Sequence, residues 1–281
     1  MNKLIIITLL TCFVVPFTFA QEKAYQIYNK DGNKISYKTM VFKAKKVDVV
    51  LFGENHNDPI SHWLQLELTK SLHEKHGADL MLGAEMLESD NQVVLDEYLL
   101  GFSREKDFEK EAKIWPNHKT DYRPLLRFAK DNDLHFVATN IPRRFANMVY
   151  RFGIDTLDYL PEASKEFITP LPMAYDTSLH CYKEISIMAG GHGGENLPKS
   201  QAIKDATMAH FIHANMKENT KFIHYHGSYH SKFHESIMWY LQQLNSELSF
   251  TTIEVVGQAD ISEFDKELLG NADFFIVVDE D

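Results

Sequence analysis

The strongest constraint on the fold is an alternation between short apolar runs and longer segments with helical spacing. The apolar runs have the length of buried strands and lie at residues 47–52, 79–84, 134–139, 221–225, 251–256 and 274–278. This alternation is typical of a largely parallel sheet that is covered by helices. The sequence therefore predicts an α/β fold with a mostly parallel central sheet flanked by helices.

The segments between the apolar runs predict the helices. After the first run, Asp58 can cap a helix and Pro59 can occupy its first position. Leu64, Leu68 and Leu72 then share one face of that helix. Further helices are predicted to begin near residue 89 and to span residues 121–131, 142–152, 198–216 and 231–244.

Residues 155–198 differ from the rest of the chain. They contain four prolines and the glycine-rich run "AGGHGG". We expect this segment to form a partly helical insertion, or lid, between the third and fourth predicted strands. Because the chain has 281 residues and is 44% hydrophobic, it can bury a full core. Residues 21–281 are therefore expected to form a single α/β domain.

The first twenty residues have the pattern of a secretory signal peptide. Lys3 supplies a positive charge, residues 4–15 are apolar, and residues 18–20 resemble a cleavage site. Cys12 raises the alternative of a lipid anchor, but Thr11 is unfavourable before a lipidated cysteine. We expect a protein exported to the periplasm or cell envelope. Without residues 1–20 only Cys181 remains, so no internal disulfide is expected.

The charge balance restricts the partners. The chain carries 29 basic and 40 acidic side chains, a net charge of −11, and no basic run. An acidic surface is repelled by phosphate backbones and by anionic lipid. We therefore expect no nucleic-acid partner.

Polar side chains follow four of the predicted strands where each strand ends. They are Glu54, His56, Glu85, Asn140, His224, His226 and His230. In an open parallel sheet, ligands bind outside the carboxyl ends of the strands, so these side chains are expected to lie together. Each of them taken alone is more often an ordinary hydrogen-bonded loop residue. Their coincidence, with two Gly-x-x-His units at residues 53–56 and 227–230, favours a shared site.

The residue types of this site suggest a divalent metal such as Mn or Zn. Two imidazoles and one or two carboxylates form a normal ligand set that leaves a position open for water. The predicted ligands are Glu54, His56, Glu85, His226 and His230. The predicted catalytic residues are Glu54, His56, Glu85 and His230, with Glu54 as a general base toward the bound water.

Two further groups have a plain structural explanation. The lid carries Tyr175, His180, Cys181, Tyr182 and His192, whose residue types ligate haem iron but also occur in ordinary aromatic loops. In "PKSQAIKDATMAHFI", the spacing places Gln201, Asp205 and Met208 on one helical face. We interpret that segment as an ordinary amphipathic helix.

Several of these motifs together resemble a known family. The segments "LFGENHNDPISHWLQLEL", "LMLGAEM", "DYRPLLRFAK", "ATNIPRR", "QAIKDATMAHFI" and "HYHGSYHS" occur in the order seen in ChaN-like haem-binding proteins. That family belongs to the haem-binding uptake and Tiki superfamily. The resemblance extends from about residue 47 to residue 256.

The resemblance implies an exported haem-binding protein of an iron or haem acquisition system. Similar proteins hold haem in a dimer with a tyrosine on the iron, so a homodimer and an outer-membrane uptake partner are expected. By their position in the sequence, the candidate haem-binding residues are Tyr175, Tyr182, His180 and His192 of the lid near the iron, and Arg143, Arg144 and Lys204 near the propionates.

The superfamily also implies an alternative function. It includes the Tiki metalloproteases and the erythromycin esterases, and Tiki members hold a divalent metal with two Gly-x-x-His motifs and a glutamate. That pattern corresponds here to His56, His230 and Glu85. The alternative is therefore a metal-dependent hydrolase. A third interpretation is a scaffold that binds neither haem nor metal.

Overall fold

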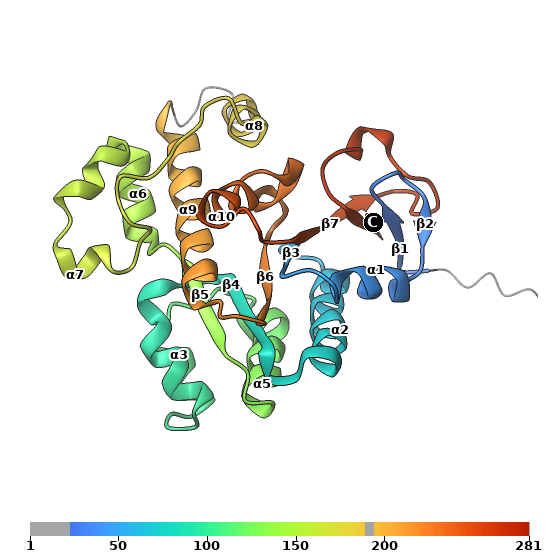
Figure 1. The fold of residues 1–281 in the computed structure, drawn as a ribbon, viewed down its shortest axis with the longest axis horizontal. Coiled ribbons are helices and arrows are strands. Elements are labelled where there is room, and N and C mark those ends of the chain that lie inside the picture. Colours follow the sequence, from blue (N-terminus) through green and yellow to red (C-terminus); the bar gives the residue numbers. More distant parts are fainter. Residues whose placement is uncertain (1–22, 189–193, 281) are drawn as a thin grey trace, which may run out of the picture.

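A single mixed sheet forms the centre of the molecule. The structure is a computed structural model that describes residues 23–188 and 194–280. Within these residues the strand order is β2-β1-β8-β7-β3-β6-β4-β5. The pairs from β8 to β5 are parallel, whereas β1 pairs antiparallel with β2 and β8. The prediction of a mostly parallel sheet flanked by helices is confirmed (Figure 1). The signal-peptide segment, Cys12 and His192 lie outside the described residues.

All six predicted strands are present. The strands are β1 (Tyr25–Asn29), β2 (Lys34–Ile35), β3 (Val49–Glu54), β4 (Leu80–Glu88), β5 (Phe136–Asn140), β6 (Lys221–Gly227), β7 (Phe250–Gln258) and β8 (Phe274–Asp279). All six predicted strands continue beyond their apolar runs by one to four residues. β3, for example, includes Gly53 and Glu54, so the first polar site residue belongs to the strand itself.

Helices cover both faces of the sheet. The α-helices are α1 (Tyr37–Ala44), α2 (Pro59–His76), α3 (Gln92–Leu99), α4 (Glu105–Glu111), α5 (Arg123–Asp131), α6 (Arg143–Phe152), α7 (Glu162–Lys165), α8 (His180–Met188), α9 (Asn196–Asn215) and α10 (Ile237–Leu244). The expected caps are present in α2, where the Asp58 side chain accepts from the Ser61 amide and Pro59 is the first helical residue. None of the described helices has both the length and the apolar character that a membrane span requires.

One predicted helix begins later than expected. The segment 231–244 was expected to be helical throughout, but α10 begins at Ile237. Phe233, His234 and Ser236 have positive φ angles, so the chain before α10 cannot continue a right-handed helix. The residues before it form two short 3₁₀ turns instead, η5 (Ser228–His230) and η6 (Lys232–His234).

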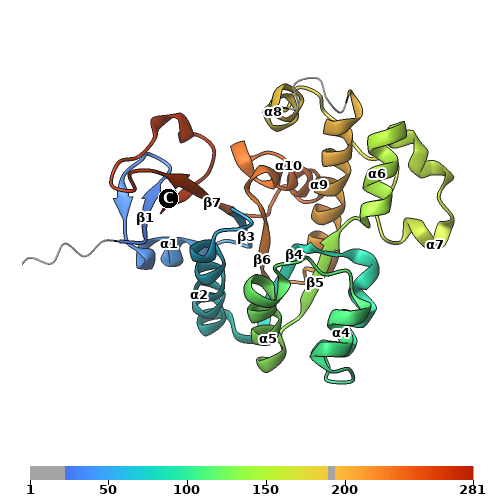
Figure 2. The same cartoon turned by 180° about the vertical axis from the view of Figure 1, so that it is seen from behind.

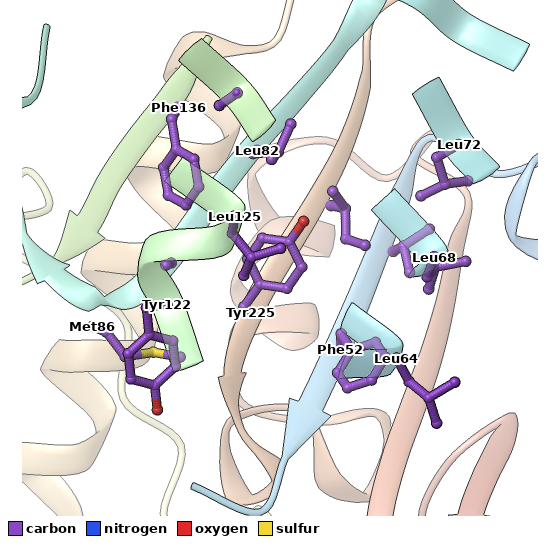
Figure 3. Packing of buried hydrophobic residues seen from close by; sticks show 14 of the residues in the cluster. Phe52, Leu64, Leu68, Leu72, Leu82, Met86, Tyr122, Leu125, Phe136 and Tyr225 are labelled. Carbon is purple, nitrogen blue, oxygen red and sulfur yellow. The ribbon is translucent and has the colours of Figure 1, made fainter. Parts of the chain in front are cut away.

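The sheet has a separate apolar core on each face. On one face, Phe52 and Tyr225 pack with Leu64, Leu68 and Leu125 of α2 and α5, as Figure 3 shows. On the other face, side chains of β3 and β6 pack against α9 and α10. In the reverse view, α1 and β1 lie at one end of the molecule and α6 and α7 at the other (Figure 2).

The predicted insertion, residues 155–198, lies within the connection between β5 and β6. It contains α7, α8 and most of a 3₁₀ turn η4 (Ile154–Tyr159), and it is flanked by α6 and α9, which were predicted as separate helices. The long helix α9 packs on β5, α6 and α10, and α8 packs on α9 and η6. The insertion thereby stands over the carboxyl ends of β4 and β6, where the polar residues were predicted to gather.

Candidate functional site

Glu54 at the end of β3 is almost fully enclosed by hydrogen-bond partners. It is 2% exposed. Its Oε1 accepts from the Tyr122 hydroxyl at 2.6 Å and lies 2.8 Å from His56 Nδ1. Its Oε2 accepts from the Gln65 side-chain amide. A carboxylate partner at Nδ1 favours the tautomer of His56 that carries its proton there. The Nε2 atom of His56 is then free to accept a proton.

The partners of Glu54 come from segments outside the predicted site. Gln65 lies on the buried face of α2. Tyr122 ends a short π-helical segment, η3 (His118–Tyr122), which directs the hydroxyl toward the sheet. His62, also on α2, lies 3.6 Å from Glu54 Oε2 and packs edge-on against the Tyr122 ring. These contacts fix Glu54 as a support for His56.

A second cluster links Glu85 and His230. Glu85 Oε2 accepts from the Gly227 amide at 2.8 Å, and its Oε1 lies 3.2 Å from His230 Nε2. The other ring nitrogen of His230 forms a very short contact with Asp205 Oδ1. Asp205 is fully buried and its Oδ2 accepts from the Tyr182 hydroxyl at 2.9 Å. A continuous chain of polar contacts therefore runs from Tyr182 to Glu85.

The charges in this second cluster favour a protonated His230. Burial alone would lower its pKa, but the carboxylates of Glu85 and Asp205 raise the pKa of His230 to about 9. Burial would raise the pKa of Glu85, yet His230 outweighs it and the pKa of Glu85 is lowered. An imidazolium has no lone pair for a metal, so His230 in this state is a hydrogen-bond donor at both nitrogens.

The two clusters meet at Gly227. A Cβ atom at this position would lie 2.8 Å from both Cε1 and Nε2 of His56 and 3.6 Å from Glu85 Oε2. The His56 ring thus rests on the Gly227 backbone beside Glu85. Burial would lower the pKa of His56, but Glu54 and Glu85 outweigh it and the pKa is raised. The absence of a side chain at Gly227 is what allows this close approach.

Two cavities adjoin at this point. The first has a volume of about 690 Å³. Its lining includes Glu54, His56, Glu85 and His230, the four predicted catalytic residues. The second has a volume of about 880 Å³ and its walls include Trp115, Arg143 and Tyr150. Both cavities are lined by His56, Glu85, Leu197 and Lys204, so they form two parts of one cleft over the strand ends.

The predicted haem-binding residues are distributed unevenly around this cleft. Arg143 and Lys204 line it. Arg144 instead forms an ion pair with Asp90 and lies over the Phe145 ring. Tyr175, His180 and Tyr182 line neither cavity.

The lid residues are engaged elsewhere. Tyr182 is buried, its hydroxyl donates to Asp205, and burial raises its pKa well above the usual value. Tyr175 packs against the Tyr182 ring, and His180 packs edge-on against Phe233. Only a change in the position of α8 would bring the Tyr182 hydroxyl to a ligand in the cleft.

His226 does not line the cleft. Alternation along β6 places His224 and His226 on the same buried face, with their Nδ1 atoms 3.0 Å apart. Burial lowers the pKa of His224 to about 3 and the pKa of His226 well below its usual value. Within residues 23–188 and 194–280, no group of three or more His, Cys, Asp or Glu side chains has the arrangement of a metal site.

Sequence reasoning missed several residues of the cleft. Asp205 was assigned to an ordinary amphipathic helix, whereas it is fully buried beside His230. Gln65 and Tyr122, which hold Glu54, and Tyr150 and Trp115, which line the second cavity, were not singled out. One signal in the sequence pointed to a buried Asp205. The residue shares a helical face with the apolar Met208, and the structure buries both side chains fully.

Comparisons with known proteins agree with this architecture. The family model described as "Haem-binding uptake, Tiki superfamily, ChaN" matches residues 40–241. Among solved structures, ChaN of Campylobacter jejuni, described as showing cofacial heme binding, has 18% identity and a TM-score of 0.66. The match covers 91% of this chain and 97% of that one.

More distant similarity extends to bacterial effectors. The type III effector HopBA1 has 14% identity and a TM-score of 0.47, with 86% of this chain and 93% of that one covered. RRSP, a MARTX toxin effector domain from Vibrio vulnificus, has 16% identity and a TM-score of 0.47 and is covered over 38% of its length, against 88% of this chain. No curated protein matches the sequence. The matched family model spans most of the chain, and the protein belongs to the ChaN family of the haem-binding uptake and Tiki superfamily.

Proposed function

We propose that this protein binds haem in the cleft over the carboxyl ends of β3, β4 and β6. The observation that carries the proposal is the pair of adjoining cavities that share His56, Glu85, Leu197 and Lys204. Each has a volume within the range of small-molecule sites, roughly 300–1,000 Å³. Membership of a haem-binding family supports haem as the ligand.

The walls of the cleft suit the two parts of a haem. Ile185, Leu197 and Val255 in the first cavity and Ile141 and Trp115 in the second offer apolar contact to the macrocycle. Haem also carries two propionates, which require cations or hydrogen-bond donors. Cations are available where the two cavities adjoin and in the wall of the second cavity.

Arg143 and Lys204 are the cations best placed for the propionates. Both line the second cavity, and neither forms an ion pair with a described carboxylate at salt-bridge distance. Arg144 contrasts with them because Asp90 already neutralises it. Lys113, also in the wall, is paired with Glu88 at 3.1 Å. In a chain with a net charge of −11, cavity-lining cations with no carboxylate at salt-bridge distance support an anionic ligand.

Tyr150 is our candidate for the iron ligand. It projects from α6, lines the second cavity and is 42% exposed. Tyrosine is an established axial ligand of haem iron. Tyr175 and Tyr182 are weaker candidates in this arrangement, because they line neither cavity and the Tyr182 hydroxyl already donates to Asp205.

We further propose that two copies of the chain enclose haem between them after export. The cofacial heme binding described for ChaN of Campylobacter jejuni supports this arrangement. Exposed apolar side chains on α6 and α8, Phe152 and Ile187, are available for contact with a second copy. Light scattering with and without haem, together with cell fractionation, tests the homodimer and the export.

Haem titration of the purified protein tests the main proposal. We expect a saturable Soret band. Tyr150→Phe should shift that band, while Tyr159→Phe, a control at an 88% exposed tyrosine outside both cavities, should not. Removal of one charge–propionate contact weakens binding by about tenfold, so this is the change expected for Arg143→Ala or Lys204→Ala. Absence of saturable binding would refute the proposal.

A specific observation also favours hydrolysis as a second candidate function. His56 has its Nδ1 held by Glu54 and its Nε2 facing Glu85 across Gly227, an arrangement in which a general base is oriented by a carboxylate. His56 can therefore take a proton from a water or a substrate in the first cavity. Assays with ester and peptide substrates, with and without added Mn or Zn, test this candidate. Equal turnover by the wild type and by His56→Ala would exclude it.

A further inference from the structure

A buried polar chain connects the helix α8 with the floor of the cleft. It starts at the Tyr182 hydroxyl on α8, passes through Asp205 on α9 and His230 in η5, and ends at Glu85 on β4. The four side chains are between 0% and 5% exposed. Four separate elements of the fold are therefore joined by three buried polar contacts, the last of which borders the first cavity.

The carboxylate of Asp205 needs both of its partners. A charge at this depth is strongly disfavoured unless each oxygen is engaged. His230 engages Oδ1, and the Tyr182 hydroxyl engages Oδ2. Loss of the hydroxyl would leave one buried oxygen without a donor, whereas loss of Asp205 would leave His230 with one carboxylate instead of two.

Polar and apolar contacts both hold α8. The Cys181 amide donates to Glu235, and Lys232 pairs with Glu184 at 3.3 Å. Cys181 and Tyr182 also belong to a buried apolar cluster that includes Ala202 of α9. Among the described residues, the Tyr182–Asp205 contact is the buried side-chain hydrogen bond that joins α8 to α9. It adds to the apolar packing and strengthens the attachment of α8.

The same helix also forms part of the cleft wall. Ile185, one turn after Tyr182, lines the first cavity together with His230. A displacement of α8 would move Ile185 away from the ligand and would remove one partner of Asp205, which holds the His230 ring together with Glu85 and the Gln201 side chain. The wall of this cavity and the position of its His230 ring therefore both depend in part on the Tyr182–Asp205 hydrogen bond.

We infer that Tyr182 and Asp205 are positioning residues that latch α8 onto the cleft and orient His230 toward Glu85. Tyr182 holds the helix, and Asp205 holds the ring. The inference rests on the proposed haem site only where it predicts that haem is released faster when the Tyr182–Asp205 contact is lost. The latch itself is a property of the protein without ligand.

Hydrogen exchange in the ligand-free protein tests the latch directly. Tyr182→Phe keeps the aromatic ring and removes the hydroxyl, so amide exchange in residues 180–188 should become about tenfold faster. Tyr225→Phe is the matched control, because Tyr225 is also buried and hydrogen-bonded through its hydroxyl, to Thr69 on the opposite face of the sheet. Tyr225→Phe should lower the free energy of unfolding about as much as Tyr182→Phe does, but it should leave amide exchange in α8 unchanged.

Asp205→Asn separates the two roles. An amide oxygen can still accept from Tyr182, so exchange in α8 should stay within about twofold of the wild type. His230 loses one of its two carboxylates, so release of haem to an excess of apomyoglobin should become faster in this variant as well as in Tyr182→Phe.

The outcomes are distinct from those of the haem proposal. Unchanged exchange in residues 180–188 of Tyr182→Phe, or an equal increase in Tyr225→Phe, would overturn the latch whether or not haem binds. Faster exchange in a protein that binds no haem would retain the latch and refute the haem site. Equal haem release from wild type, Tyr182→Phe and Asp205→Asn would overturn the link between the latch and the ligand.

Discussion

The protonation of His230 should make stability depend on pH in a defined window. The folded protein raises the pKa of His230 from its usual 6.5 to about 9, because Glu85 and Asp205 outweigh its burial. A raised pKa means that the contribution is fully present below the unfolded value of 6.5 and is lost as the pH rises through about 9. Each unit by which the folded pKa exceeds the unfolded pKa corresponds to about 1.4 kcal/mol of unfolding free energy, so the full contribution of His230 is about 3 kcal/mol.

Urea unfolding of the ligand-free, chelator-treated protein at pH 6.5, 8 and 9.5 measures this contribution. The comparison is with His230→Gln, which removes the titrating ring and keeps a hydrogen-bond donor. The variant should be less stable at every pH, because two buried carboxylates lose their cation. Its deficit should shrink by about 3 kcal/mol between pH 6.5 and 9.5, since the wild type loses its advantage there.

Because the measured quantity is a difference between two proteins, groups that titrate equally in both cancel. Glu254, which is buried and has its pKa raised to about 7, titrates at the lower end of this pH range, but it is present in both proteins and its effect cancels in the difference. A deficit of equal size at pH 6.5 and pH 9.5 would show that His230 is neutral in the folded protein. In that case the ion-paired arrangement of Glu85, His230 and Asp205 would be refuted.

Three further predictions concern the cleft and the core. In Gly227→Ala, the backbone tolerates alanine at φ −62°, but the new Cβ would meet the His56 ring at 2.8 Å, so haem affinity should fall by about tenfold or more in a Soret titration, while the free energy of unfolding should fall by about 1–3 kcal/mol. Leu68→Ala, at a fully buried core position far from the cleft wall, should cost about 2–5 kcal/mol of unfolding free energy and leave haem affinity unchanged. Elemental analysis of the purified protein should find less than about 0.1 Mn or Zn per chain, because a metal at this site would have to displace the proton that Glu85 and Asp205 favour on His230; one firmly bound ion per chain would contradict this.

The parts of the fold that could be predicted are those whose burial is uniform along the chain. β3 is buried at all six positions and reads as an apolar run, and α2 repeats its leucines on one face. β1 and β2 were missed because their edge positions mix buried and partly exposed residues. The start of α10 was missed because positive φ angles at Phe233, His234 and Ser236 leave no signature in the apolar spacing.

The position of the site could be predicted from the topology of the sheet, but the hydrogen bonds and ion pairs within it could not. The end of a parallel strand is a position that apolar runs define, so Glu54, Glu85 and His230 could be placed on one edge. Asp205 could not, because the spacing rule assigns a polar helical residue to solvent unless a partner is known. Its partners, His230 and Tyr182, are 25 and 23 residues away along the chain.

Two glutamates in equivalent positions therefore acquire different roles. Glu54 accepts from the neutral donors Tyr122 and Gln65 and lies 2.8 Å from His56 Nδ1, so both of its oxygens are engaged in positioning contacts. Glu85 accepts from a backbone amide and from a cation, and it borders both cavities. The prediction of Glu54 as a general base rested on its place at a strand end beside His56 and on a metal-bound water at that site. For the hydrolase proposed above, these contacts favour His56 as the proton acceptor and Glu54 as the residue that orients it.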